Sequence, residues 1–318
     1  MSSYNRYITS PESLVTTHEE TRAGFLRIAL EKNRVGDPFV KNALAFKAMV
    51  AHTHSAEELL TIAAVRPFLI AAAGLSEKSL AYLNEADQTL AIQELIDKFL
   101  KPAGASYIDE ATFRYLLNKG DTVGGTMRNI IGALGQERLI QTLLSCMSVR
   151  GLACDKIAVG SSRWLPVDKN AVDVEADVRA LHWCENKGER VLIFNTKIPA
   201  VSKNVDLNLF SCSIEEYQKG KIVRQNDRAI MFGELKGGID PAGADEHWKT
   251  GNSALGRIRS SFAAVGYPNV KTSFIGAAIE HAMAKEIFGQ LENGTLSNAA
   301  NLTNTNQLVD YCNWLIEL

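Results

Sequence analysis

Two carboxylates and a lysine in the second half of the chain could together hydrolyse a phosphodiester. Glu234, Leu235 and Lys236 end a short apolar run, and Asp206 lies in an earlier run of alternating residues. Residues two apart in a strand point to the same side, so Glu234 and Lys236 would share a face while Leu235 points into the core. If the two runs are neighbouring strands, the three charged groups converge at one end of a sheet. Carboxylates hold Mg²⁺ through oxygen ligands, and a lysine can orient or deprotonate the attacking water and offset charge on the phosphate.

The pattern of an acid, any residue and a lysine is weak evidence by itself. It occurs as Glu185-Asn186-Lys187 and as Glu234-Leu235-Lys236, which is about the number that composition alone would produce. We interpret the first copy as a solvated turn. The second copy is consistent with a catalytic centre or with an ordinary salt bridge at a strand end. His247 follows soon after and could accept a proton from water at the same sheet edge; the alternative is a surface histidine.

The elements around these residues are predicted from periodicity and turn residues. A hairpin is expected over 180–195, with its turn at Asn186-Lys187-Gly188. The alternation over 205–212 predicts a strand with Asp206 and Asn208 on its polar side. Further strands are expected at 229–236 and 272–279, and helices at 245–265, 280–291 and 307–316. The strand that ends at Lys236, its helix and the strand at 272–279 would form a right-handed crossover in a mixed sheet.

The first part of the chain reads as helical. Asp37-Pro38 predicts a helix start, because proline is favoured at the first helical position. Other helices are expected at about 85–100, 110–117 and 126–149. Residues 120–129 read either as a turn between helices or as a candidate surface for contacting DNA. The expected organisation is therefore a mostly helical region over 1–150 and an α/β region over 151–318.

Composition restricts the class of protein. The 318 residues are 46% apolar with a net charge of −2, which is typical of a globular protein and does not favour one that coats nucleic acid nonspecifically. No apolar run is long enough to span a bilayer, and the N-terminus lacks a secretory core, so a cytoplasmic protein is expected. The five cysteines contain no CxxC pair and are expected to be buried thiols rather than disulfides or zinc ligands.

The order and spacing of Asp206, Glu234-Leu235-Lys236 and His247 resemble the PD-(D/E)xK centre of the AvaI/BsoBI restriction endonucleases. The surrounding segments KNVDLNLFSC and FGELKGGIDPAGADEHWKT are similar to that family, as is GDTVGGTMRN in the first half. The resemblance covers nearly the whole chain. One departure from the broad pattern is Val205, where a proline would precede the first aspartate; this position has no chemical role.

The resemblance implies an α/β fold with a restriction-endonuclease-like mixed sheet flanked by helices and an additional, mostly helical region. It implies a Mg²⁺-dependent homodimer that encloses double-stranded DNA and cuts CYCGRG after the first C, leaving 5′ overhangs. Asp206 and Glu234 match the metal-binding acids, Lys236 the catalytic lysine, and His247 a histidine near the attacking water. In a restriction–modification system, the host would also contain a cognate DNA methyltransferase, not necessarily in contact with the enzyme.

Several residues are candidates for DNA contacts. Lys203 and Asp240 flank the catalytic residues; lysine suits the guanine acceptors and aspartate the cytosine amino group. Their alternatives are a loop charge and a turn residue that resembles a helix cap. Arg128 and Asn129 could reach the duplex from the segment 120–129, and Arg257 and Arg259 could contact phosphates or form a solvated helix face.

Two other functions stay open on the sequence. A repair nuclease or junction resolvase with the same fold would cut selectively by DNA structure. A DNA-binding module with a degenerate centre would bind without cleaving, but the intact Asp206, Glu234 and Lys236 count against it. A nucleotide-binding phosphate loop is excluded because the chain contains no GxxxxGK[ST] motif.

Overall fold

The computed structural model describes residues 4–167 and 178–318. It divides into two compact units, which we call the sheet unit (Met1–Phe25 and Ile130–Leu318) and the helical unit (Leu26–Asn129). The helices are α1 (His18–Met49), α2 (Arg66–Ala72), α3 (Glu77–Leu80), α4 (Glu85–Leu95), α5 (Tyr107–Val149), α6 (Ile214–Gln218), α7 (Ala244–Ala264), α8 (His281–Glu292) and α9 (Thr305–Glu317). Described residues up to Val149 contain no strand, but the units divide within α1 and α5 rather than at residue 150.

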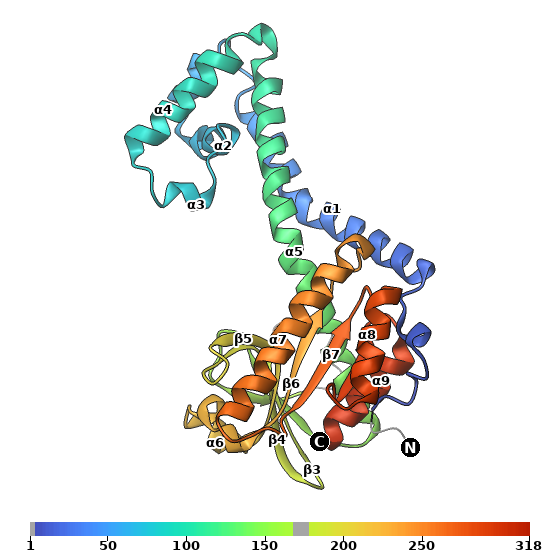
Figure 1. The fold of residues 1–318 in the computed structure, drawn as a ribbon. Coiled ribbons are helices and arrows are strands. Elements are labelled where there is room, and N and C mark those ends of the chain that lie inside the picture. Colours follow the sequence, from blue (N-terminus) through green and yellow to red (C-terminus); the bar gives the residue numbers. More distant parts are fainter. Residues whose placement is uncertain (1–3, 168–177) are drawn as a thin grey trace. The chain divides into compact units, whose positions relative to one another are not determined.

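The described strands form one eight-stranded mixed sheet in the order β2-β1-β3-β4-β5-β6-β7-β8 (Figure 1). Their bounds are β1 (Cys154–Ala158), β2 (Trp164–Pro166), β3 (Val178–Glu185), β4 (Gly188–Ile198), β5 (Lys203–Ser211), β6 (Ala229–Lys236), β7 (Lys271–Gly276) and β8 (Asn298–Asn301). Neighbours from β2 to β6 are antiparallel, whereas β6, β7 and β8 run parallel. The mixed α/β fold and the parallel connection of β6 to β7 through α7 are therefore as predicted.

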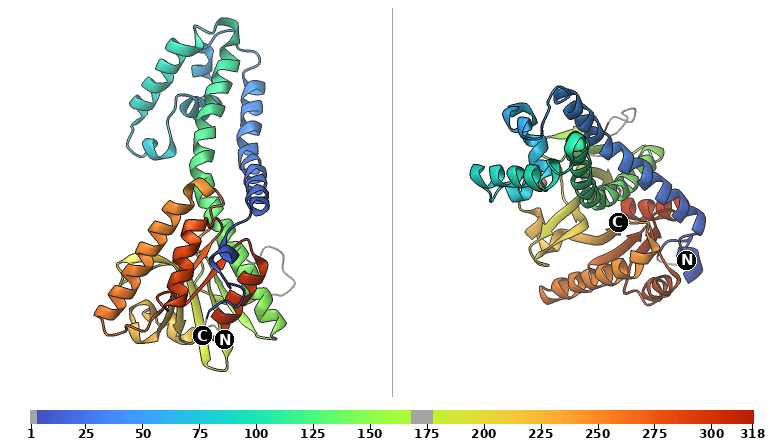
Figure 2. Two further views of the ribbon diagram at one scale, coloured as in Figure 1. Left: turned by 45° about the vertical axis from the view of Figure 1, so that its right-hand side comes forward. Right: turned by 90° about the horizontal axis from the view of Figure 1, so that it is seen from above.

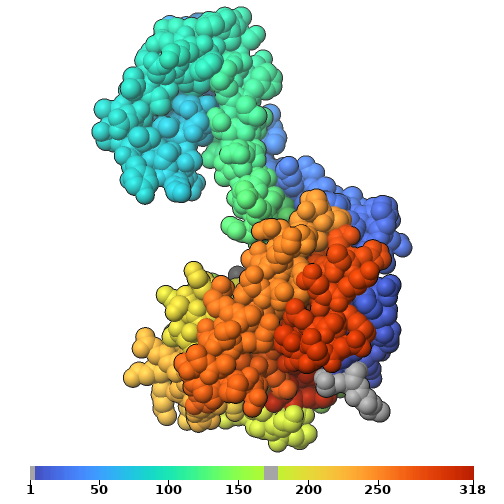
Figure 3. Space-filling view, in the orientation of Figure 1, coloured from blue at the N-terminus to red at the C-terminus, as the bar shows by residue number. Residues whose placement is uncertain are grey.

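Both faces of the sheet are covered within the sheet unit. On one face, Phe232 and Phe274 pack against Phe262 and Trp248 of α7, and Figure 3 shows α7 and α8 side by side on this surface. On the other face, the Tyr311 hydroxyl of α9 lies 2.8 Å from Ser273 Oγ. The start of the described chain runs beside α9, where Arg6 pairs with Asp310 (Figure 2). Phe232, Glu234 and Lys236 are every second residue of β6 and lie on the face that α7 covers. The two charged side chains therefore point toward the α7 side of the sheet.

The helical unit has a core of its own. The rings of Phe46 of α1, Phe68 of α2 and Tyr115 of α5 form a continuous stack, with centroid separations of 3.8 and 4.0 Å. None of the described helices is both long and apolar enough to cross a membrane.

Three local predictions were wrong: the helix start at Asp37-Pro38, the turn at residues 120–129 and the burial of all five cysteines. Asp37-Pro38 does not start a helix, because Pro38 lies inside α1, and residues 120–129 are not a turn, because they continue α5 as a helix. All five cysteines are free, as expected, but Cys184 is exposed and Cys154 only partly buried. The predicted hairpin was correct: β3 and β4 meet at the pair Glu185 and Gly188, and Gly188 takes a positive φ of 108°.

Candidate functional site

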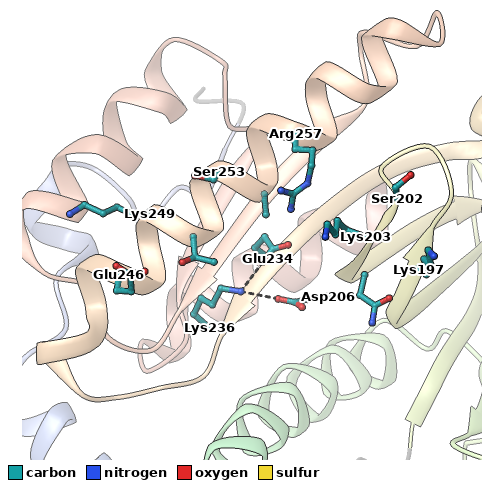
Figure 4. A pocket seen from close by; sticks show the side chains of 13 residues that line it. Lys197, Ser202, Lys203, Asp206, Glu234, Lys236, Glu246, Lys249, Ser253 and Arg257 are labelled. Atoms are coloured by element: carbon teal, nitrogen blue, oxygen red, sulfur yellow. Dashed lines mark hydrogen bonds and ion pairs between the residues drawn. The ribbon is translucent and has the colours of Figure 1, made fainter.

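Asp206, Glu234 and Lys236 meet at one edge of the sheet. The β5–β6 ladder ends at the pair Leu207 and Gly233, so the next backbone groups of the two strands are not paired with each other. The Asp206 Oδ2 atom instead accepts a hydrogen bond from Leu235 N at 2.8 Å, which fixes the carboxylate beside β6. Lys236 Nζ donates to Glu234 Oε2 at 2.7 Å and lies 3.5 Å from Asp206 Oδ2. The three residues expected to converge do so (Figure 4).

The two carboxylates lie close together where water is partly excluded, so a negative charge on one makes a negative charge on the other less favourable. Glu234 is only 5% exposed. Burial, with a further contribution from the negative charge of Asp206, raises the pKa of Glu234 to about 7. Burial works against the charged form of Lys236, but the carboxylates of Asp206 and Glu234 outweigh it, so the pKa of Lys236 is raised. The site holds more negative charge than one lysine neutralises and therefore suits an additional cation.

These residues lie in an open pocket of about 980 Å³. The strand wall contributes Lys197 from β4, Lys203 and Asn204 from β5, and Ser202 from the loop between them. The helix wall is one stripe of α7, formed by Glu246, Lys249, Thr250, Ser253, Ala254 and Arg257. Residues three or four apart on a helix share a face, so the helical periodicity of α7 explains why this set faces the pocket. Sequence reasoning did not single out Lys197, Ser202, Asn204, Glu246 or Lys249.

His247 lies beside the pocket rather than in its lining. A Cβ at Gly238 would lie 2.9 Å from the His247 Cε1 atom, and one at Gly243 would lie 3.6 Å from it. The ring therefore packs over the loop that follows β6, where two glycines leave room for it. The structure does not bring the ring to the carboxylates by a hydrogen bond within the described residues, and its chemical role stays a prediction.

Lys203 and Asp240 differ in their surroundings. Lys203 is exposed and lines the pocket beside Asp206. Asp240 lies outside that lining, and its Oδ1 atom accepts a hydrogen bond from Ala242 N at 3.0 Å, so it caps the short 3₁₀ helix Pro241–Gly243. This capping bond uses one carboxylate oxygen and leaves the second available.

The remaining candidates for DNA contacts also differ in whether they line the pocket. Arg257 lines the pocket, whereas Arg259 is partly buried and donates from Nη1 to Thr272 Oγ1 of β7 at 3.1 Å. Arg128 and Asn129 are exposed on α5, but they belong to the helical unit, while the pocket belongs to the sheet unit.

Comparison with known proteins identifies the family. The family model described as restriction endonuclease BsobI matches residues 4–318. The type II restriction enzyme BsoBI of Geobacillus stearothermophilus is 42% identical over 99% of this chain and 98% of its own length. The type II restriction enzyme AvaI of Nostoc is also 42% identical, over 99% of both chains. The chain belongs to the BsoBI restriction endonuclease family. The resemblance seen in the sequence is thereby confirmed, and it extends over both units.

Because the chain belongs to the BsoBI restriction endonuclease family, the hypothesis for this site is a metal-dependent centre. The carboxylate oxygens of Asp206 and Glu234 are ligands that suit Mg²⁺. This ion is commonly held by one or two carboxylates together with waters and substrate phosphates rather than by a closed protein cage. Asp206 and Glu234 supply two such carboxylates, and their mutual repulsion would be relieved by a divalent cation. Within the part of the chain that the structure describes, no group of three or more His, Cys, Asp or Glu residues is placed to hold a metal ion.

Proposed function

We propose that this member of the BsoBI family is a Mg²⁺-dependent endonuclease that hydrolyses phosphodiester bonds in double-stranded DNA at CYCGRG and leaves 5′ overhangs. The observation that carries the proposal is the convergence of Asp206, Glu234 and Lys236 in one pocket of a chain that resembles type II restriction enzymes over its full length. The sequence of the target is inferred from the family resemblance alone.

Each residue of the centre has a separate task. Asp206 and Glu234 would hold the metal, and Leu235 N keeps Asp206 oriented. Bound Mg²⁺ would polarise the phosphate and lower the pKa of a bound water. Lys236 carries its ammonium within reach of both carboxylates, where it can orient the attacking water and offset the charge that develops on the phosphate. His247 would accept the proton of that water after a change of its ring orientation or through a bridging water.

Recognition of a palindrome calls for two-fold symmetry, so a homodimer would read one half-site with each subunit. Lys203, exposed in the pocket, is our candidate for contacting guanine, and the free oxygen of Asp240 for contacting cytosine. The mostly helical region over 1–150 would enclose the duplex and contribute dimer contacts, with Arg128 and Asn129 of α5 facing DNA. Such an enzyme would act inside its cell together with a methyltransferase that protects the same site.

Digestion of a long sequenced DNA by the purified protein tests this function directly. The reaction is run with Mg²⁺ and with EDTA, and the fragment ends are mapped; the Glu234→Ala variant serves as a control for contaminating nucleases. We expect discrete ends within CYCGRG only with Mg²⁺ and only with the unmodified centre. Discrete ends at another palindrome would keep the mechanism and discard the inferred target. Cuts at junctions or lesions would favour a repair nuclease or resolvase, and binding without any cleavage would favour a DNA-binding module.

A further inference from the structure

Among the residues that the structure describes, three cationic side chains of the pocket have no acidic partner. Lys236 is bound to both carboxylates, and Lys249 forms an ion pair with Asp245. In contrast, Lys197, Lys203 and Arg257 form neither an ion pair nor a side-chain hydrogen bond within residues 4–167 and 178–318. All three are exposed, so their charges are available to a ligand.

Two of these cations lie on different walls of the pocket. Lys197 belongs to β4 and is paired across the ladder with Asn204 of β5, so it is fixed to the strand wall. Arg257 belongs to the pocket-facing stripe of α7, one turn after Ser253. Figure 4 shows the Arg257 side chain extending from the helix into the pocket, on the side where Lys203 lies. A ligand in the pocket would therefore meet positive charge from the sheet and from the helix.

Positive charges in one pocket repel one another unless water or an anion compensates them. The phosphates of a DNA strand are such anions. The guanidinium of Arg257 can donate two parallel hydrogen bonds to phosphate oxygens, whereas Lys197 acts as a compact point charge. Asp206 and Glu234 in the same pocket repel an approaching phosphate when no metal is bound. Positive charge on both walls would offset that repulsion.

We propose that Lys197 and Arg257 form a phosphate clamp that holds the backbone of the strand entering the pocket, and that the clamp works before the metal binds. This inference rests on the proposed function, because it takes DNA as the ligand. It assigns the two residues to positioning rather than to the chemical step. Lys203, which lies nearer Asp206 in sequence and on the same strand, keeps its separate assignment to a base contact.

Arg259 provides a matched control on the same helix. It lies two residues beyond Arg257, but its guanidinium is directed to Thr272 of β7 and does not line the pocket. Removing Arg257 or Arg259 deletes the same charge from α7, and only the first deletion removes it from the pocket. Arg257 forms no ion pair or side-chain hydrogen bond with the residues that the structure describes, so its replacement should leave the fold intact.

The test is metal-free binding of a fluorescein-labelled duplex that contains one CYCGRG site, followed by anisotropy in EDTA at increasing KCl concentration. Each lost phosphate contact reduces the slope of log affinity against log salt by about 0.9 and weakens binding roughly eightfold at 0.1 M salt. We expect this change for Lys197→Ala and for Arg257→Ala, and about twice the change in slope for the double variant. Arg257→Lys should restore most of the slope, and Arg259→Ala should match the unmodified protein.

Slopes equal to that of the unmodified protein for both single variants would overturn the clamp. An equal loss in Arg259→Ala would also overturn it, because the effect would then come from overall charge. The outcome is separable from that of the proposed function. If the unmodified protein cleaves duplex DNA while the clamp variants bind normally, only the clamp fails; if it cleaves no duplex while the slopes fall, the nuclease proposal fails and the phosphate site stands.

Discussion

Helix α5 and the residue that follows strand β6 are in close backbone contact at Gly135 and Gly237. A Cβ added to Gly135 would lie 2.8 Å from Gly237 Cα and 3.3 Å from Leu302 Cδ2. A Cβ added to Gly237 would lie 2.7 Å from the carbonyl oxygen of Ile131. Gly237 directly follows Lys236, so this contact lies immediately beside the end of β6. We predict that Gly135→Ala lowers both stability and cleavage rate.

The expected loss of stability follows from the distance between the added Cβ at Gly135 and the Cα atom of Gly237. Ordinary contact begins at 3.4 Å, so the methyl group of Gly135→Ala would push the backbones apart by about 0.6 Å. Overpacking of this kind costs about 1–3 kcal/mol, and better helix propensity returns up to about 1 kcal/mol. The expected net loss therefore lies between about 0 and 3 kcal/mol, with about 1.5 kcal/mol in the middle of this range. Because a shift of about 1 Å in a reacting group can cost about 10²-fold, a displacement passed to Lys236 should slow cleavage about ten- to a hundredfold.

Gly132→Ala is the matched control, because a Cβ at Gly132 meets no atom within 4 Å. It lies on the same helix and should raise stability by up to about 1 kcal/mol while leaving the cleavage rate unchanged. Thermal unfolding followed by circular dichroism gives the order of stabilities, and single-turnover cleavage gives the rates. If Gly135→Ala were as stable and as active as Gly132→Ala, the close backbone contact would not exist in solution and the reasoning would be refuted.

Three further predictions concern the centre itself. Glu234→Ala should abolish cleavage yet keep DNA binding in Ca²⁺, because it removes one of the two carboxylates that we propose hold the metal; retained cleavage would exclude Glu234 from the mechanism. His247→Ala should slow single-turnover cleavage roughly 10²-fold or more if the ring accepts the proton of the water. A change of less than a few-fold would leave His247 as a packing residue over Gly238 and Gly243. Lys203→Ala should reduce discrimination between cognate and one-base-altered duplexes in competition binding, whereas uniform weakening would identify a phosphate contact.

The sequence by itself determined that the side chains of Glu234 and Lys236 lie on one face of a strand. A strand repeats every two residues, so Glu234 and Lys236 had to share a face of β6. The expectation that Leu235 alone points into the core was wrong, because Glu234 lies on the same face as the buried Phe232 and is itself buried, while Leu235 is only partly buried. The hairpin around Asn186-Lys187 and the connection from β6 through α7 to β7 were likewise predicted, because turn residues and periodicity are local properties. The family resemblance was also present in the sequence and was confirmed by the comparisons.

Other features were decided by contacts between residues distant in the chain. The segment Asn298–Asn301 forms β8 although it lacks β-branched or alternating residues, because β7 and α9 bury it. Asp37-Pro38 was read as a helix start and residues 120–129 as a turn between helices or a surface for contacting DNA, yet each segment lies inside a long helix. Local propensity lowers helix stability by about 1 kcal/mol at a glycine and about 3 kcal/mol at a proline, and a long helix can contain such residues because helix formation is cooperative.

The composition of the site itself also depended on tertiary structure. Only the end of the β5–β6 ladder at Leu207 and Gly233 brings the Asp206 carboxylate to Leu235 N and Lys236. Lys197 has no local pattern that marks it, and Arg257 and Arg259 look alike in the sequence. The fold separates them, because one arginine faces the pocket and the other packs on Thr272. A side chain's type fixes what chemistry it can perform, but its neighbours, which are set by packing over long separations in the chain, decide whether it performs it.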